Sequence, residues 1–424
     1  MNFAAYADIW RLPAVRQAVL LGALGKAPWF GAGIVLTLHV VGSLGASYAS
    51  AGLVTAVFTI AIALASPIRG RLLDTIGLRR TLLPSLVLLP VAFLAAPFLD
   101  YWPLMFVMGG VGLLAIPWFV LTRQLMLAAV PESQRRAALA LDSVVTEMAF
   151  MGGPTVGILL ATSWDTGWTL ALLACLSVAA AALLAVLNPP LVSEKRDAAG
   201  AEPKPSAEGT QALGGTQALG GRVGMRSWLN GPVVATFVAT MAASFTLAGT
   251  DLAMVAAARS LESSSALAIL IVVWGFGSLI GGLLFGGLPR GTLGITHLLV
   301  GLGVTTMLAA LGTNLWVLAA LLGVAGLFCA PTLAATSERL GDLVPATSRG
   351  EAFGWSGTMA TAGNALAPPV VGYVLDTGGW QLGFVITGLC GLALAGVGWV
   401  SLQAGRRGLA RARRRGLDKL RQPG

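Results

Sequence analysis

The sequence predicts an all-α membrane protein with twelve transmembrane helices in two pseudo-symmetric six-helix bundles. Of its 424 residues, 56% are hydrophobic and only 11% are charged, whereas a soluble globular chain has ~25% charged residues. The apolar residues form blocks long enough to cross the hydrocarbon core as helices, which takes ~20 residues. They do not alternate with polar residues as in a membrane β-barrel. Because lipid offers the backbone no hydrogen-bond partner, each block is predicted to be a helix.

The apolar blocks define twelve predicted spans, and the first, which is longer than a signal-peptide core, is expected to be retained as a span. The spans lie near residues 15–41, 48–68, 79–99, 103–126, 137–162, 167–188, 230–256, 265–287, 292–311, 315–336, 352–375 and 380–403. Between the sixth and seventh lies a stretch rich in Pro, Gly and charge, with too little apolar surface to fold. The expected domains are an N-terminal bundle (1–188), a cytoplasmic linker (189–228), a C-terminal bundle (229–403) and a basic cytoplasmic tail (404–424).

Positive charge sets the predicted orientation. With a cytoplasmic amino terminus, nearly every Lys and Arg falls in an inward-facing loop; Arg259 lies in an outward loop and Lys26 deep inside a span. Both termini are therefore expected in the cytoplasm. The abundance of arginine, alanine and glycine suits a GC-rich bacterial genome, hence a bacterial inner membrane. The tail RRGLARARRRGLDKLRQ is expected to bind anionic lipid head groups and not nucleic acid.

The residue inventory argues against several chemistries. Cys175, Cys329 and Cys390 all lie in apolar blocks far apart in the sequence, as expected of packing residues and not of a disulfide or metal framework. His39 and His297 are the two histidines, too few for a histidine-built metal or catalytic centre. No cluster of His, Asp or Ser typical of an enzyme stands out. We expect no enzymatic activity, no cofactor and no metal site.

The two halves resemble each other. VPESQRRAALAL precedes the fifth predicted span and VPATSRGEAFGW precedes the eleventh. Each is followed by a patch of small residues that contains proline, GGPTVG in the first half and APPVVG in the second. Two related six-span halves are typical of secondary transporters, whose substrate site lies near the midplane between the halves.

The stretch GRLLDTIGLRR, residues 70–80, holds four charged residues, where the average composition would give about one. It resembles the motif G-x-L-x-D-x-x-G-R/K-R/K between the second and third spans of the major facilitator superfamily. The matching residues are Gly70, Leu72, Asp74, Gly77, Arg79 and Arg80. The twelve-span layout extends the resemblance over the whole chain except the linker and tail. The resemblance implies the major facilitator fold.

The resemblance implies that the motif acts as a conformational latch, and the properties of its residues are consistent with that role. Gly70 lets its helix approach a neighbour closely, and Gly77 permits a turn that other residues resist. The carboxylate of Asp74 suits the exposed amides of a helix N-terminus. The resemblance implies that Asp74 contacts the start of span eleven, near Ala352, and clasps the two halves on the cytoplasmic side.

The arginines of the stretch have separate expected roles. Arg71 is expected to pair with Asp74, while Arg79 and Arg80 are expected to fix the loop to the cytoplasmic leaflet. An alternative is a loop whose charges only stop the helices from sliding. That alternative explains the arginines but not Asp74 or the two glycines.

The fifth predicted span carries GGPTVG, with Gly152, Gly153, Pro154 and Gly157. The glycines allow tight helix packing, and the proline frees a carbonyl and permits bending. The pattern resembles G-x-x-x-G-P-x-x-G-G, which the family associates with exporters, although Ala149 and Ile158 replace its first and last glycines. The resemblance favours export. Small residues are also common at any membrane helix interface, which leaves ordinary packing as the alternative.

Charges inside the predicted spans are candidates for coupling, since a buried charge in a membrane usually faces a cavity or a partner. Lys26 lies ten residues beyond Arg16, at a depth of ~15 Å, and Glu147 lies at a similar depth. We predict that these two side chains pair in the central cavity and that one titrates during transport. A permanent structural pair is the alternative. Asp142 is a candidate gate or relay residue, and Asp251 lies either at the cavity mouth or at a water-exposed helix end.

Aromatic residues inside spans offer a surface that can stack planar ligands or hold a cation. The candidate cavity residues are Trp29, Phe30, Trp118, Trp274, Trp355 and the polar Asn364. One departure from the drug–proton antiporters of the family is the fourth span. Its usual arginine is replaced by Phe106 or Val107 in PLMFVMGGVG, so coupling through an arginine there is not expected.

The sequence therefore favours a major facilitator transporter, a proton-coupled exporter of small amphipathic compounds that acts as a monomer by alternating access. Protons, a small-molecule substrate and membrane lipids are the expected partners. One alternative is an importer or uniporter for a polar metabolite. Another, of a different class, is a membrane receptor or enzyme that transports nothing.

Overall fold

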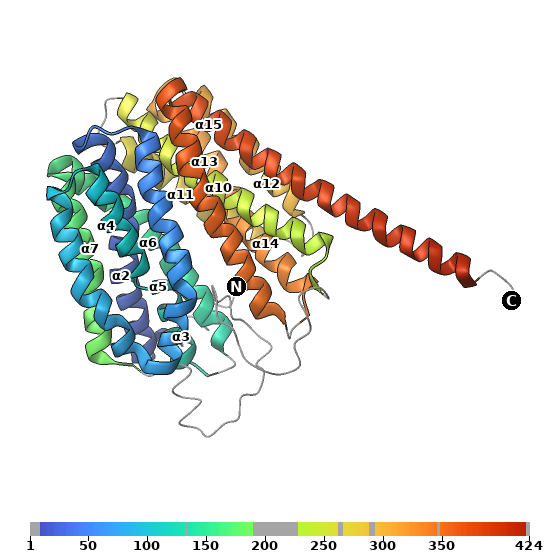
Figure 1. Cartoon of the computed structure of the whole chain (residues 1–424), viewed down its shortest axis with the longest axis horizontal. Helices are drawn as coiled ribbons and strands as arrows, with labels where there is room; N and C mark the ends of the chain where they lie inside the picture. Colours follow the sequence, from blue (N-terminus) through green and yellow to red (C-terminus); the bar gives the residue numbers. More distant parts are fainter. Residues whose placement is uncertain are drawn as a thin grey trace.

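The computed structural model describes residues 9–131, 134–189, 228–261, 266–287, 293–345 and 348–420 (Figure 1). Within these ranges, the side chains at 67, 70, 71, 74, 75, 135–137, 139, 140, 143, 349–351 and 398–420 lie outside the description. The described segments are helices joined by short connections, with no strand among them. The all-α class predicted from the sequence is confirmed.

The helices of the first half are α2 (Pro13–Leu38), the π-helical turn η1 (His39–Ser43), α3 (Tyr48–Ala95), η2 (Ala96–Phe98), α4 (Tyr101–Leu113), α5 (Trp118–Ala129), α6 (Arg135–Ser163) and α7 (Thr166–Leu187). Those of the second half are α10 (Gly231–Ser260), α11 (Ala266–Gly287), α12 (Ile295–Leu308), η4 (Ala309–Leu311), α13 (Leu315–Gly326), α14 (Cys329–Leu343) and α15 (Arg349–Leu420).

Ten helical segments of the described chain are long and apolar enough to span a membrane. One of them, Ala352–Val397, is 46 residues long, enough for two crossings at ~20 residues each. A shorter apolar helix covers Ile295–Leu311. The protein is therefore a multi-pass membrane protein, while the number of twelve crossings stays a prediction.

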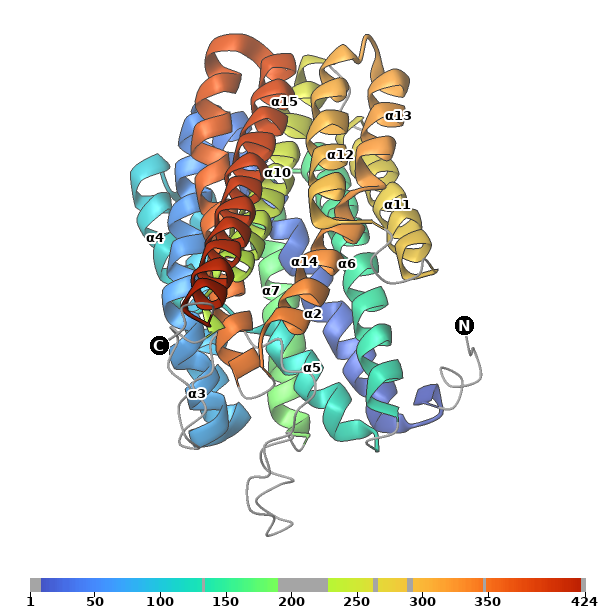
Figure 2. The same cartoon turned by 90° about the vertical axis from the view of Figure 1, so that its right-hand side faces the viewer.

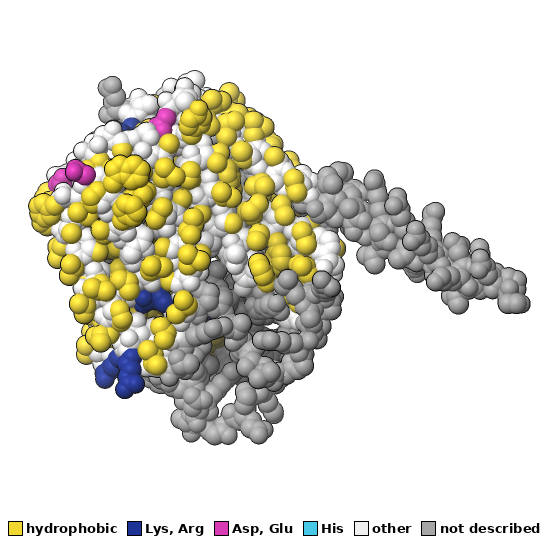
Figure 3. All heavy atoms as spheres, in the orientation of Figure 1, with side chains coloured by type: hydrophobic (Ala, Val, Ile, Leu, Met, Phe, Trp, Pro, Cys, Tyr) yellow, Lys and Arg dark blue, Asp and Glu magenta, His cyan; other side chains and the backbone are white. Residues whose placement is uncertain are grey.

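Two glycines break the longest helices at opposite ends of the molecule. Gly77 in α3 has φ +79° and Gly379 in α15 has φ +78°, a left-handed conformation that side chains disfavour. The turn predicted at Gly77 is present. We call the end that carries Gly77 the Arg80 end and the end that carries Gly379 the Asp376 end. Figure 3 shows basic side chains near the first end, acidic ones near the other, and hydrophobic ones over the flank between.

The described apolar core falls into two large clusters. One is built from residues between Ile9 and Ala185; the other lies between Phe245 and Phe384 and also takes in Ile158 of α6. The bundles meet where α3 lies against α15 and α6 against α11 (Figure 2). The predicted domain boundaries stay predictions, since most of the linker, residues 190–227, lies outside the description. In the tail, the backbone of α15 continues to Leu420.

Glycine lets α2 and α6 pack closely. A methyl group on Gly153 would overlap the carbonyl group of Ala27, and one on Gly157 would lie 3.1 Å from Val35. Pro154 is buried beside them in α6. Gly152 is exposed and has open space around it. The tight packing that the sequence predicts for both glycines before the proline is therefore correct for Gly153 and wrong for Gly152.

We expect Gly153→Ala to destabilise the protein by about 1–3 kcal/mol, because the added methyl group must push α2 and α6 apart. The measurement is the thermal unfolding midpoint of the detergent-solubilised protein. Gly152→Ala is the matched control, which should be neutral or slightly stabilising since alanine favours the helix. Equal midpoints for the two variants would contradict this account of the α2–α6 contact.

Candidate functional site

A buried ion pair joins α2 and α6 inside the first bundle. Lys26 is 1% exposed, and its Nζ lies 2.8 Å from Oδ1 of Asp142. Nζ also donates to the hydroxyl of Thr146 at 2.8 Å, while that hydroxyl donates to the backbone carbonyl of Asp142. The ring of Phe119 lies 5.5 Å from Nζ, a cation–π distance. Because a buried charge is costly unless it is paired and hydrogen-bonded, this arrangement lets the ammonium group exist in the bundle.

The predicted partner of Lys26 was Glu147, and that prediction is wrong. Asp142 makes the ion pair instead, and its role as a gate or relay residue stays a prediction. Glu147 is half-buried in α6 and has no hydrogen bond or ion pair within the described part of the chain. The structure therefore separates a paired carboxylate from an unpaired one on the same helix.

Arg123 belongs to the same cluster, although the sequence analysis did not single it out. It is half-buried in α5 and lies within electrostatic range of both Lys26 and Asp142. The sequence places it in an arginine–glutamine pair inside the apolar run WFVLTRQLMLAA. This polar interruption of an apolar run was the sequence signal from which Arg123 could have been predicted as a site residue. The fourth span thus carries an arginine after all, nearer the Arg80 end than the position where the family motif predicted it.

A row of rings leads from the ion pair to the second bundle. Ring centroids lie 5.9 Å apart between Phe119 and Phe30, 5.2 Å between Phe30 and Phe150, and 5.9 Å between Phe150 and Trp274. We call these four residues the aromatic row. Its members come from α5, α2, α6 and, across the junction between bundles, α11. The sequence predicted Phe30 and Trp274 but not Phe119 or Phe150.

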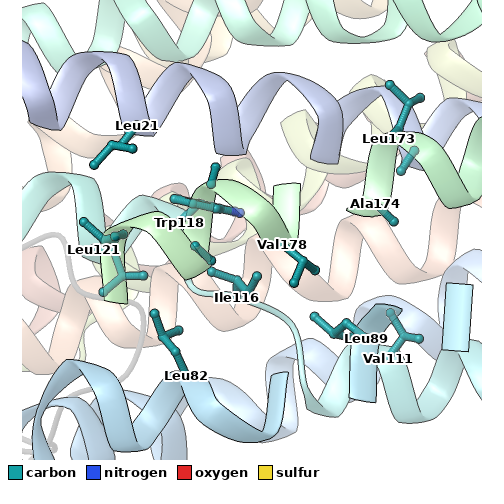
Figure 4. Close-up of a cluster of buried hydrophobic side chains, with 14 of the residues drawn as sticks. Leu21, Leu82, Leu89, Val111, Ile116, Trp118, Leu121, Leu173, Ala174 and Val178 are labelled. Atoms are coloured by element: carbon teal, nitrogen blue, oxygen red, sulfur yellow. The ribbon is translucent and has the colours of Figure 1, made fainter. Parts of the chain in front are cut away.

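The sequence predicted Trp118 to be a cavity residue, and that prediction is wrong. Trp118 is part of the first core (Figure 4). It is 1% exposed and packs with Leu21 and Leu121. Its indole N–H donates to Ser177 at 3.0 Å, and the Ser177 hydroxyl donates to the carbonyl of Gly25 at 2.9 Å. With its polar atom satisfied inside the bundle, Trp118 connects α5 and α7 to α2, the helix that carries Lys26.

The remaining predicted cavity residues lie apart from the aromatic row. Trp29 is half-buried and packs against Phe58, with ring centroids 5.7 Å apart. Trp355 and Asn364 are exposed on α15. No contact in the described chain links either of them to the ion pair. Their roles in substrate binding stay predictions.

Asp251 lies well inside α10 and is half-buried, so it is not at a water-exposed helix end. Like Glu147, it has no hydrogen bond or ion pair in the described part of the chain. Both carboxyl groups lie within electrostatic range of the thiol of Cys329 in α14. Two unpaired acids, one from each bundle, therefore approach a common residue. Within the described residues, no three His, Cys, Asp or Glu side chains are grouped as metal ligands.

At the Asp376 end, a carboxylate joins the two bundles. Asp376 in α15 accepts hydrogen bonds from the backbone N–H groups of Tyr48 at 2.8 Å and Ala49 at 2.9 Å, in the first turn of α3. The positive end of a helix favours an anion at this position. Arg259 of α10 hydrogen-bonds to the Tyr48 side chain. Arg259, which the sequence analysis predicted in an outward loop, thus takes part in the contact between bundles at the Asp376 end.

Glycine allows α3 and α15 to approach each other near Asp376. Side chains at Gly52 and Gly372 would overlap the carbonyl groups of Pro368 and Tyr48, respectively. From there the two helices diverge toward the Arg80 end (Figure 1). The bundles are therefore joined at the Asp376 end in this conformation.

The predicted latch at the Arg80 end is described only in part. The side chains of Gly70, Arg71 and Asp74 lie outside the description, so the contact between Asp74 and α15 stays a prediction. The sequence analysis expected Arg79 to fix the loop to the cytoplasmic leaflet. In the structure its Nε and Nη2 donate to the backbone carbonyls of Ala185 and Val186 at 2.7 and 2.8 Å. It thereby caps the C-terminal end of α7.

Comparison with known proteins supplies the family context. A sequence model described as the Major Facilitator Superfamily matches residues 19–286 and 234–422. A comparison with curated protein sequences found no match. The solved structure of the nucleoside transporter NupG is similar, with a TM-score of 0.70 and 16% identity, over 92% of this chain and 99% of that one.

Two further solved structures are similar. A bacterial homologue of the human lysosomal transporter Spinster, inward-facing and unoccupied, has a TM-score of 0.68 and 13% identity, covering 93% of this chain and 98% of that one. The human organic anion transporter MFSD10 has a TM-score of 0.59 and 17% identity, covering 91% of this chain and 100% of that one. At such identities the likeness shows the fold and not the substrate.

We expect Asp142→Asn to lower stability by about 3–5 kcal/mol, because it leaves the buried ammonium of Lys26 without its carboxylate. The thermal midpoint of the purified protein measures the loss. Glu147→Gln is the matched control on the same helix and should change the midpoint little, since Glu147 has no partner to lose. A larger fall in the thermal midpoint for Glu147→Gln than for Asp142→Asn would contradict this account and would support pairing of Lys26 with Glu147.

We expect Asp376→Asn to weaken the junction at the Asp376 end, since charge-assisted hydrogen bonds are roughly twice as strong as neutral ones. Spin labels at positions 43 and 377, with the native cysteines replaced by alanine, report the distance between bundles. The variant should populate longer distances about tenfold more, for a cost of ~1.4 kcal/mol.

Asp165→Asn is the control for this experiment. Asp165 accepts a hydrogen bond from the N–H of Trp168 at 2.9 Å and so caps α7 within one bundle. Its loss removes the same chemistry without touching the junction. If the two variants gave the same distance distribution, Asp376 would have no special role in holding the bundles together.

Proposed function

This chain belongs to the Major Facilitator Superfamily, and from that premise we propose that it is a proton-coupled exporter of small amphipathic organic compounds that works by alternating access. The observation that carries the proposal is the aromatic row beside the buried Lys26–Asp142 pair. The row crosses from one bundle to the other, and this junction is where transporters of this architecture place their substrate.

The aromatic row suits a flat amphipathic ligand. Rings stack on planar substrates, and their faces attract cations. Phe119 is partly exposed although it lies beside Lys26, so one of its faces is open to a ligand. Trp274 is 3% exposed and belongs to the second core cluster, so a ligand would meet the row at Phe119, Phe30 and Phe150. Because Phe150 and Trp274 belong to different bundles, their contact links a ligand on the row to the second half.

Glu147 is the proposed proton carrier. A carboxyl group without a partner in a low-dielectric interior is more stable neutral than charged. In our proposal a cationic substrate that enters from the cytoplasm stabilises the charged form, and the proton leaves to the cytoplasm. The bundles then rock, the substrate leaves on the far side, and Glu147 takes a proton from there. Asp142 stays with Lys26, and Asp251 is a second acceptor from the other bundle.

The proposed orientation places the Arg80 end in the cytoplasm of a bacterial cell, because positively charged loops remain on that side. In that orientation, the junction at Asp376 closes the outer side, and the conformation is inward-facing. A latch at Asp74 would form when the inner side closes. The protein would act as a monomer in the inner membrane, with its basic tail on anionic lipids.

Uptake of a polar metabolite is the second candidate. NupG is a nucleoside transporter, and the aromatic row could also stack a nucleobase. An importer of this kind would bring substrate and proton across in the same direction. The two candidates therefore differ in the sign of the proton movement that the substrate causes.

We expect Glu147→Gln to abolish transport driven by protons and to weaken binding of a cationic substrate, because glutamine keeps the shape of the side chain but can neither carry the proton nor become negatively charged. The measurement uses acidified everted membrane vesicles with a pH-sensitive dye. Planar organic cations should discharge the gradient for the native protein and not for the variant.

Asp100→Asn is the control, since Asp100 is an exposed acid at the Asp376 end and should keep full activity. Discharge that persists unchanged in Glu147→Gln would contradict the role of Glu147. Discharge by nucleosides and not by organic cations would contradict the proposed substrate class, whereas further acidification of the vesicles on adding nucleosides would favour the second candidate.

A further inference from the structure

A groove lies on the flank of α3, away from the junction between bundles. It has a volume of about 410 Å³ and is formed by both arms of α3, before and after the turn at Gly77, and by the end of α4. Its lining is mostly apolar, with two arginines: Leu64, Ala65, Ile68, Arg69, Leu72, Ile76, Arg80, Thr81, Pro84, Leu113 and Leu114.

Arg69 lies at the floor of this groove and is only 7% exposed. Its Nη2 donates to the hydroxyl of Ser85 at 2.6 Å and to the carbonyl of Thr81 at 3.4 Å. The Ser85 hydroxyl is fixed in turn by the carbonyl of Leu114 at 2.7 Å. The guanidinium group is therefore held in one position by neutral acceptors.

The charge of Arg69 is not balanced by the described chain. Its buried Nε has no hydrogen-bond partner, and no ion pair to Arg69 is formed there. Arginine has five N–H donors arranged to bind an oxyanion with two at once. Arg69 lines the groove, has only neutral partners and keeps one buried donor without a partner, a combination that an anion bound in the groove would balance.

The walls of the groove indicate what kind of molecule carries the anion. Leu64, Ile68 and Leu113 are exposed, and the described flank in Figure 3 is mostly hydrophobic. Arg69 itself falls between the membrane-spanning segments Tyr48–Ser66 and Ile76–Phe98, at the depth where head groups meet hydrocarbon. Arg80 is exposed at the rim of the groove.

We propose that this groove binds one anionic glycerophospholipid of the surrounding membrane. The phosphate lies against Arg69 and Arg80, and the acyl chains run along Leu64, Ile68 and Leu113. A zwitterionic lipid fits the walls but leaves its cation against two arginines, and a soluble phosphate leaves the apolar walls in water. The combination of charge and apolar surface selects an anionic lipid.

The test is native mass spectrometry of the full-length protein in detergent with added phosphatidylglycerol. Occupancy of the first lipid should fall about fivefold in Arg80→Gln, the change expected from one basic residue near an anionic head group. Arg69→Gln should lower it more, but this residue is buried and its variant can misfold. Leu113→Trp therefore provides a second variant, which fills the groove from an exposed position and should also reduce occupancy at least fivefold.

Arg16→Gln is the matched control, an exposed arginine in α2 near the Arg80 end but outside the groove, and it should leave occupancy unchanged. The basic tail is present in every variant, so its contribution cancels. Phosphatidylcholine with the same acyl chains should bind at least fivefold more weakly.

Three results would each overturn the proposal. The first is equal occupancy by phosphatidylcholine and phosphatidylglycerol. The second is unchanged occupancy in both Arg80→Gln and Leu113→Trp. The third is displacement of the lipid by millimolar inorganic phosphate, which would indicate a site for a soluble anion.

Discussion

In the low dielectric of the bundle interior, a charged side chain is stable only when it is paired and hydrogen-bonded. The rest of the site depends on which charged side chains have such a partner. Lys26 is almost completely buried, so its ammonium group is stable only with a carboxylate and hydrogen-bond acceptors around it. Asp142, Thr146 and Phe119 provide them. Because Asp142 is paired with Lys26, Glu147 on the same helix has no cation partner within the described residues. One ion pair thus distinguishes a paired carboxylate from the unpaired one that we propose as the proton carrier.

The two ends of the molecule use the same local device. The sequence DTIG at 74–77 and the sequence DTGG at 376–379 each place an aspartate three residues before a glycine with φ close to +80°. In each case the glycine ends one arm of a long helix, and the aspartate lies in the last turn of that arm. At the Asp376 end the carboxylate caps the first turn of α3 in the other bundle. With one such cap at each end of the molecule, each of the two states of alternating access would have its own junction between the bundles.

The sequence predicted the helical class, the turn at Gly77 and the deep position of Lys26, because apolar blocks, glycine and charge leave clear local signals. It did not predict the partner of Lys26, since counting residues gives depth along a helix but not direction around it. Asp142 and Glu147 are five residues apart and so point about 140° apart on the helix. The same limit placed Trp118 in a cavity when its ring lies in the core. The role of Asp376 was not predicted, because its partners are backbone N–H groups of α3, which leave no signal in residue type.

The most direct test of the account is infrared difference spectroscopy of the purified protein, which separates protonated from ionised carboxyl groups. At neutral pH the account predicts a component of the protonated carboxyl band that is lost in Glu147→Gln and persists in a folded Asp142→Asn variant, because Asp142 is paired with Lys26. Asp251, the other unpaired acid, accounts for what remains of the band in Glu147→Gln. If the component were lost in the Asp142 variant and persisted in the Glu147 variant, the assignment of the paired and the proton-carrying acid would be reversed and the account would be wrong.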